Sequence, residues 1–239
     1  MRDTYSSVKI ILYIEEYMKN WLKELLFSLT ISPLVFSAQM PVQTLQNGTV
    51  VMGIYGDIES SDGQQFINIT ESWRLSGHPI QMITLHSGGG SVKSGYQIAD
   101  YIMRHKIQTV VMGNSVCASS CFNIFIAGQP RVSESNSKIG VHRISSGSDD
   151  THLARSLSID MSAYYKSMRV PNNIRLAMLE TPPEHMYWLT SKDLKDISDY
   201  QLNYSEAVKV FSDGGLKESK SMITSHSKSK ARDLNTEAK

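Results

Sequence analysis

Serine residues that could act as nucleophiles gather where an apolar strand leads into an apolar helix. The segment 113–121 reads GNSVCASSC and is followed by the apolar stretch 122–127. Small residues here allow Ser119 to stand on the first helical turn, where free N–H groups and the helix dipole favour negative charge. A serine in this place could equally serve only as a helix cap. Ser119 alone therefore does not establish a catalytic site.

A histidine and a glycine loop supply the other parts that a reactive serine needs. His142 directly follows the apolar residues 139–141, at the expected end of a strand. Serine is a weak nucleophile at neutral pH unless a base, usually histidine, takes its proton. The segment 86–92 reads HSGGGSV, and its consecutive glycines let backbone N–H groups approach a ligand closely. Each part also has a purely structural interpretation, since glycine turns and isolated histidines are common in proteins.

Alternating apolar runs and amphipathic stretches predict the elements that position these residues. Helices are expected from Ser61 or Asp62 to Gly77, then over 92–105 and 118–127. The strands expected from short apolar runs cover residues 50–55, 80–85, 108–112 and 139–141. Strands and helices that alternate at this spacing predict an α/β fold of βαβ units around a mainly parallel sheet.

In their order and spacing, these features resemble the ClpP-like proteases of the ClpP/crotonase superfamily. The family loop Asn-Ser-Pro-Gly-Gly-x-Val corresponds to residues 86–92, and its Gly-x-Ala-Ala-Ser motif corresponds to residues 115–119. The apolar helix ends in Ala127-Gly128, as the family's does. The similarity runs from Val50 to Thr190 and implies a ClpP/crotonase-like fold. The Cys-Ala-Ser-x-Cys variant is similar to a periplasmic branch of the family.

The resemblance implies a role for each matching residue. Ser119 would be the nucleophile and His142 the general base of an acyl-transfer reaction. The N–H groups of Gly90, helped by Gly89, and of Ser120 would bind the oxyanion. The family's chemistry needs no cofactor, and its substrates are peptides or proteins.

The family's catalytic aspartate has no clear counterpart in this sequence. Aligning residues 188–190 with the family's Phe-Leu-Ser-like segment places Met186 where the aspartate should be. Glu184 lies just upstream and Asp193 lies downstream on the next expected helix. Glu184 reaches His142 only if the double-proline turn before it is placed favourably. The sequence leaves open Glu184 as the acid, a Ser–His dyad, or a degenerate site.

Two cysteines, Cys117 and Cys121, flank Ser119. Residues four apart on a helix lie about 5–6 Å from each other, which is within the Cα separation of a disulfide. An oxidising compartment would allow the bond, and close packing of two small buried residues is the alternative. Two thiols without further spaced ligands do not make a zinc site, so we expect no metal.

The N-terminal region predicts export. Residues 22–38 are apolar but interrupted, and they are too short for a typical membrane span of about 20 apolar residues. Lys19, Lys23 and the small-residue exit Ser37-Ala38 fit a signal peptide, for which Met18 would be a more typical start than Met1. An uncleaved anchor is the alternative, and membrane association is expected only in that case. The predicted organisation is an extension with a signal peptide over 1–38, a ClpP-like domain over 39–213 and a disordered polar tail over 214–239.

The balance of charges argues against nucleic acid as a partner. The 239 residues include 24 basic and 23 acidic side chains, a net charge of +1, and no basic stripe indicates a nucleic-acid partner. The predicted protein is an exported, periplasmic serine peptidase. The resemblance to the family further implies assembly into a homo-oligomer, for which a helix over 151–168 could serve. Two alternatives remain: a crotonase-type enzyme that binds an acyl thioester, and a non-catalytic binding module, for which the missing aspartate is the best support.

Overall fold

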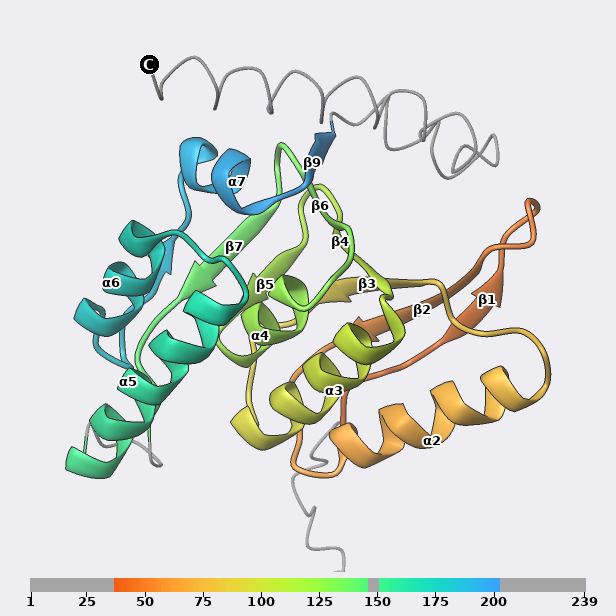
Figure 1. Cartoon of the computed structure of the whole chain (residues 1–239), viewed down its shortest axis with the longest axis horizontal. Helices are drawn as coiled ribbons and strands as arrows, with labels where there is room; N and C mark the ends of the chain where they lie inside the picture. Colours follow the sequence, from red (N-terminus) through yellow and green to blue (C-terminus); the bar gives the residue numbers. More distant parts are fainter. Residues whose placement is uncertain (1–36, 146–150, 203–239) are drawn as a thin grey trace, which may run out of the picture. The chain divides into compact units, whose positions relative to one another are not determined.

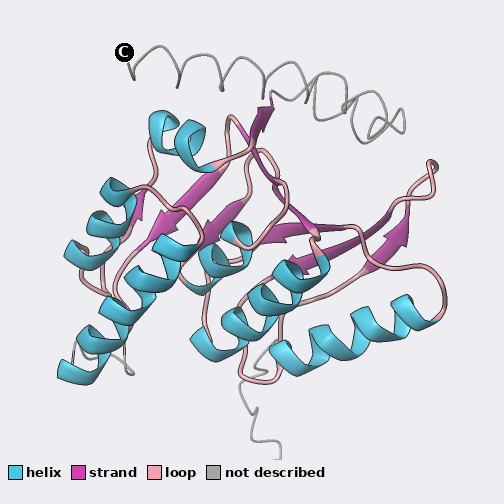
Figure 2. Cartoon of the chain, in the orientation of Figure 1, coloured by secondary structure: helices cyan, strands magenta, loops and turns pink. Residues whose placement is uncertain are grey.

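A six-stranded sheet forms the centre of the computed structural model, which describes residues 37–145 and 151–202 (Figures 1 and 2). The first strand is antiparallel to its neighbour and all other neighbours are parallel, which confirms the α/β class with a mainly parallel sheet. The strands lie in the order β1 (Val42–Thr44), β2 (Val50–Tyr55), β3 (Met82–His86), β4 (Gln108–Val111), β6 (Arg131–Glu134) and β9 (Tyr200–Leu202).

A second sheet of three short strands carries the serine segment and the histidine. It consists of β5 (Val116–Ala118), β7 (Lys138–Val141) and β8 (Tyr187–Trp188), with β5 parallel to β7 and β7 antiparallel to β8. A single parallel bridge between Ser87 and Cys117 joins this sheet to the chain just after β3. The two sheets therefore bring three distant segments of sequence to one place.

Six helices are described, and Figure 2 shows them against the strands. The glycine loop leads directly into α3, whose N-cap Ser91 accepts a hydrogen bond from the Ser94 backbone. Such caps satisfy one of the free N–H groups at a helix start. The helices are α2 (Asp62–Leu75), α3 (Val92–His105), α4 (Ser120–Ile126), α5 (His152–Ser167), α6 (Asn172–Glu180) and α7 (Ser191–Ile197).

Helix α4 lies at the centre of the hydrophobic core. All seven of its residues are buried, and Phe122 and Phe125 are among the largest side chains that are shielded completely from solvent. Ile98 and Ile102 of α3 belong to the same core cluster. Because well-packed cores move little, α4 fixes the position of Ser119, the residue that directly precedes it.

The observed boundaries match the sequence-based expectations closely, with two informative differences. Strand β2 and helix α3 have the predicted ends, whereas the strand expected over 80–85 is β3, shifted by up to two residues. The helix expected over 118–127 begins later, because Val116–Ala118 pairs with β7 as a strand. The predicted signal peptide, except for Ser37 and Ala38, and the predicted tail lie outside the described residues. No helix within 37–145 and 151–202 is both long and apolar enough to cross a membrane.

Candidate active site

Ser119 occupies a sharp turn between a strand and a helix. It follows β5 directly, precedes α4, and has backbone angles of φ 55° and ψ −125°. A residue other than glycine in this region of φ/ψ space costs about 1–3 kcal/mol and persists only where its surroundings hold it. Here the Ser119 N–H donates to Gly140 O at 3.1 Å, and its carbonyl accepts from Phe122 N at 2.9 Å. The same strand–turn–helix geometry presents the nucleophilic serine in enzymes of the α/β-hydrolase fold.

The glycine loop packs directly against this turn. Ser87 N donates to Val116 O at 2.8 Å, and Ala118 N donates to Ser87 O at 3.1 Å, so the start of the loop is joined to β5 by a parallel bridge. Gly89 has φ 106°, and a Cβ placed on it would lie 2.6 Å from Ser119 Cβ. Only glycine allows this approach, because a side chain at Gly89 would displace the serine.

Two backbone N–H groups beside Ser119 have no hydrogen-bond partner among the described residues. Ile58 bonds to the residues on either side of Gly90, with Ile58 N donating to Gly89 O and Ser91 N donating to Ile58 O. In such a parallel bridge the middle residue directs its own N–H away from the partner. The Ser120 N–H starts α4, where the first N–H groups of a helix have no partner within the helix. Both groups are free to donate to a bound oxygen.

His142 lies one residue beyond β7 and lines the same pocket as Ser119. Its ring is half-buried, and burial lowers the pKa of His142 below the ordinary value, while the backbone carbonyl of Pro183 acts in the opposite direction. The Nδ1 atom is shielded from solvent and has no hydrogen bond of normal geometry. No hydrogen bond joins the His142 ring to the Ser119 hydroxyl in this structure, although catalytic contacts in unliganded enzymes are often long.

No Asp or Glu side chain forms a hydrogen bond or ion pair with His142 in the described part of the chain. Strand β8 pairs with β7 so that Val141 lies opposite Tyr187, and one step further along this register puts Met186 opposite His142. The Met186 side chain packs against Gly140. Glu184 lies exposed on the preceding turn and makes no hydrogen bond to the histidine.

The other acidic candidate, Asp193, stabilises the start of α7. It is buried and accepts hydrogen bonds from the Thr190 backbone and hydroxyl at 2.9 and 2.7 Å, from Asn173 at 2.7 Å and from Tyr187 at 3.2 Å. Burial works to raise the pKa of Asp193, but these bonds outweigh it and hold the pKa below the ordinary value. Its lone pairs are directed to these partners, and none of them is His142.

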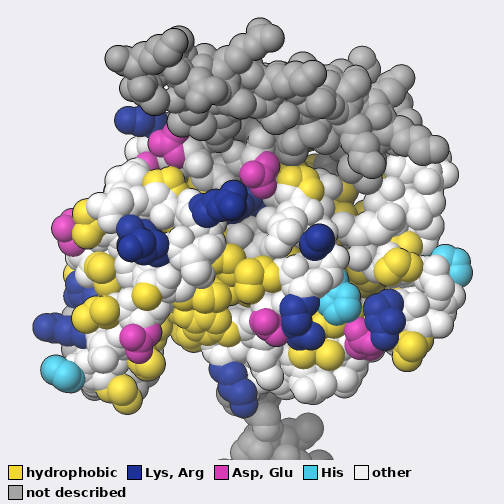
Figure 3. Space-filling view, in the orientation of Figure 1, with side chains coloured by type: hydrophobic (Ala, Val, Ile, Leu, Met, Phe, Trp, Pro, Cys, Tyr) yellow, Lys and Arg dark blue, Asp and Glu magenta, His cyan; other side chains and the backbone are white. Residues whose placement is uncertain are grey.

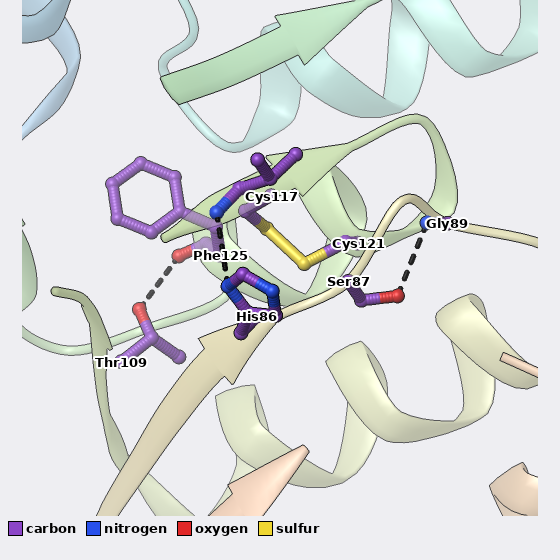
Figure 4. The surroundings of a disulfide bond; sticks show 8 residues. His86, Ser87, Gly89, Thr109, Cys117, Cys121 and Phe125 are labelled. Atoms are coloured by element: carbon purple, nitrogen blue, oxygen red, sulfur yellow. Dashed lines mark hydrogen bonds between the residues drawn. A yellow bond between two sulfur atoms is a disulfide. The ribbon is translucent and has the colours of Figure 1, made fainter. Parts of the chain in front are cut away.

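The two cysteines form a disulfide that brackets Ser119. The structure joins Cys117 at the middle of β5 to Cys121 in the first turn of α4, with the Cα atoms 5.2 Å apart. Figure 4 shows the bond beside the segment from His86 to Gly89, where the Gly89 N–H donates to the Ser87 hydroxyl. The cross-link therefore ties together the strand and the helix between which the strained serine stands.

The pocket beside Ser119 is lined by buried polar groups that the sequence did not reveal. It has a volume of about 70 Å³, and its lining includes Gly90, Ser120 and His142. The Tyr165 hydroxyl donates to Asn123 Oδ1 at 2.6 Å, while Asn123 Nδ2 and the Ser120 hydroxyl are buried without a partner. Buried polar atoms in native proteins are almost always paired, so these two are available to a bound molecule. In the sequence, Asn123 is indistinguishable from any other residue of the expected helix. Only the folded structure, which places it opposite α5, makes it part of the site.

Hydrophobic side chains gather next to this pocket between α3 and α5 (Figure 3). Tyr96 of α3 contacts two residues of α5, with its hydroxyl 2.9 Å from Met161 Sδ and its ring 4.7 Å from that of Tyr164. In the described ranges, no group of three potential metal ligands comes together. The site thus combines a serine, a histidine and free N–H groups beside an apolar surface.

Comparison with known proteins identifies the family and the fold of the chain. The model of the Clp protease family matches residues 64–194, more than half of the chain. Among solved structures, ClpP1 from Listeria monocytogenes has a TM-score of 0.52 at 21% sequence identity, covering 66% of this chain and 94% of that chain. A mutant of the 1510-N membrane-bound stomatin-specific protease has a TM-score of 0.49 at 18% identity, with coverages of 66% and 81%. No curated protein sequence matches. The family match and the shared fold lead to one conclusion: the chain belongs to the Clp protease family.

Proposed function

We propose that this protein is an exported serine peptidase that cleaves peptide bonds through an acyl-enzyme formed on Ser119. The strained backbone of Ser119 carries the proposal, because a buried, well-packed helix holds a serine in a conformation that serves no capping role. Its side chain makes no cap hydrogen bond to α4. Strain of this kind clusters at sites of chemistry.

In the proposed reaction His142 removes the proton of the Ser119 hydroxyl as the oxygen attacks the peptide carbonyl. The N–H groups of Gly90 and Ser120 then donate to the oxyanion, and His142 returns the proton to the departing amine. Water hydrolyses the resulting ester by the same steps in reverse order. Because no carboxylate among the described residues contacts His142, we infer that the working unit is a Ser–His dyad. Burial lowers the pKa of His142 and so favours the neutral imidazole that can act as a base.

Hydrolysis of an unfolded protein substrate tests the proposal. Purified processed protein should release peptides from reduced, alkylated casein, and the Ser119→Ala variant should release none. Ser115→Ala is the matched control, since Ser115 lies outside the pocket lining and should leave the rate unchanged. Equal peptide release by the wild type and Ser119→Ala would refute the proposal and favour a binding module built on the same fold.

We also propose that the protein assembles into a homo-oligomer through α5. Leu153 and Leu157 lie one turn apart on this helix and are 63% and 44% exposed, an arrangement that places them on one face. An apolar face in water favours burial against a second copy. Sedimentation should show an oligomer that the double variant Leu153→Asp, Leu157→Asp dissociates. A monomer at every concentration would contradict this assembly.

A further inference from the structure

Asp62 is a completely buried carboxylate without a cationic partner among the described residues. It is 0% exposed, and the ion pairs of the described chain do not include it. Its Oδ2 atom accepts from Ala38 N at 3.0 Å and from Glu59 N at 2.8 Å, and its Oδ1 atom accepts from the Ser37 hydroxyl. A buried charge is costly unless it is paired, so these neutral partners leave Asp62 short of a counter-charge.

Ala38, one of the two residues whose N–H groups donate to Asp62, is also the first buried residue of the described chain. Ala38 is 2% exposed, and the next residue, Gln39, exchanges two backbone hydrogen bonds with Tyr55 at 2.8 and 3.0 Å. Figure 1 shows the start of α2 beside the beginning of the described chain. The sequence predicts cleavage of the exported chain after Ser37 or after Ala38, which is the same place.

We propose that cleavage falls between Ser37 and Ala38 and that the new α-ammonium group of Ala38 forms a buried ion pair with Asp62. A leader-removing endopeptidase would catalyse attack of water on the Ser37 carbonyl. The peptide C–N bond breaks, Ser37 leaves as a carboxylate, and Ala38 N becomes an ammonium group. This group carries three N–H donors, so it can serve Oδ2 and also replace the departed Ser37 hydroxyl on Oδ1. Cleavage after Ala38 would instead remove both partners and leave the buried carboxylate with Glu59 N alone.

The ion pair between the Ala38 ammonium group and Asp62 would help to position the glycine loop through a short series of contacts. Asp62 holds Glu59 N, and Glu59 O accepts from the Ser94 hydroxyl at 2.7 Å. The residue before Glu59, Ile58, makes the two backbone hydrogen bonds to the loop residues on either side of Gly90. Processing would thus supply the charge that fixes the segment 58–62, against which the proposed oxyanion-binding loop is aligned. This part of the inference rests on the proposed peptidase activity, whereas the ion pair itself rests only on the proposed export.

Chemical labelling of the α-amine tests the pair directly. Protein processed during export is purified, sequenced from its N-terminus, and treated with formaldehyde and cyanoborohydride near neutral pH, folded and in denaturant. We expect the sequence to begin at Ala38 and its amine to methylate at least about tenfold more slowly in the folded protein, since a buried pair holds the proton on the amine. The Asp62→Asn variant should remove this protection, and the matched control Asp196→Asn, at an exposed position, should retain it.

A chain that begins at Gln39, or an Ala38 amine that reacts equally fast in folded and denatured protein, would overturn the proposal. If Asp62→Asn does not fold, the comparison of folded and denatured wild type still decides. A fluorophosphonate should react several-fold more slowly with Ser119 in folded Asp62→Asn than in wild type. If wild-type Ser119 does not react at all, the proposed peptidase function fails, but α-amine protection still tests the ion pair.

Discussion

Replacing Gly89 with alanine tests how closely the glycine loop and the serine turn depend on each other. Gly89 has φ 106°, and an added Cβ would lie 2.6 Å from Ser119 Cβ and 2.7 Å from Ala118 O. Ordinary contact begins at 3.4 Å, so the two segments must separate by about 0.8 Å (3.4 minus 2.6 Å). A misplacement of about 1 Å at a reactive group can cost about 10²-fold in rate. Backbone strain and overpacking together should also destabilise the fold by about 2–5 kcal/mol.

The assay is the second-order rate of fluorophosphonate labelling, read by intact mass on protein that circular dichroism shows to be folded. We expect Gly89→Ala to react about 10²-fold more slowly than wild type. The adjacent variant Gly88→Ala is the control, because the nearest atom to its added Cβ is Asp57 Oδ1 at 3.7 Å. It should react within about twofold of wild type, since the substitution makes only ordinary contact. Equal rates for Gly89→Ala and Gly88→Ala would refute the close packing of loop and serine.

Three further predictions concern the base, the acid and the disulfide. Burial lowers the pKa of His142, so the neutral base persists to lower pH. The acid limb of the pH–rate profile should therefore have its midpoint below about 6.5. A midpoint above that value would contradict the assignment of His142 as the base. Glu184→Gln should change peptide hydrolysis by less than about twofold, since a dyad needs no carboxylate, whereas a loss of orders of magnitude would make Glu184 the acid. Denatured, unreduced protein should contain no free thiol, and the double variant Cys117→Ala, Cys121→Ala should be less stable by about 2 kcal/mol, because the bond closes a short loop. Two free thiols, or unchanged thermal unfolding, would contradict the last prediction.

The sequence predicts the elements around the site better than it predicts their pairing. Strand β2 and helix α3 have the expected ends because each carries a clear apolar period and is bounded by turn residues. Strand β5 was missed because Val116–Ala118 is short, made of small residues, and defined by its partner β7 rather than by any local pattern. Strand β8 likewise exists only through its pairing with β7.

The missing catalytic acid and the buried Asp62 are two features of the structure that sequence patterns do not predict fully. Spacing alone placed Met186 at the position of the family's aspartate, and the register of β8 puts the same residue opposite His142. Whether Glu184 could turn towards the histidine depends on the conformation of the Pro182-Pro183 turn, which no periodicity predicts. Asp62 appears in sequence only as one of two possible helix starts, since its contact with Ala38 joins segments that have no pattern in common.

The central claim is that Ser119 is a nucleophile activated by His142, and labelling with a fluorophosphonate tests it most directly. Phosphonylation followed by intact-mass and peptide analysis should show one adduct, at Ser119, on the folded wild-type protein. The His142→Ala variant should lose the adduct, and Ser115→Ala should retain it. A folded wild-type protein that remains unmodified, or that carries its adduct on a different serine, would contradict the account.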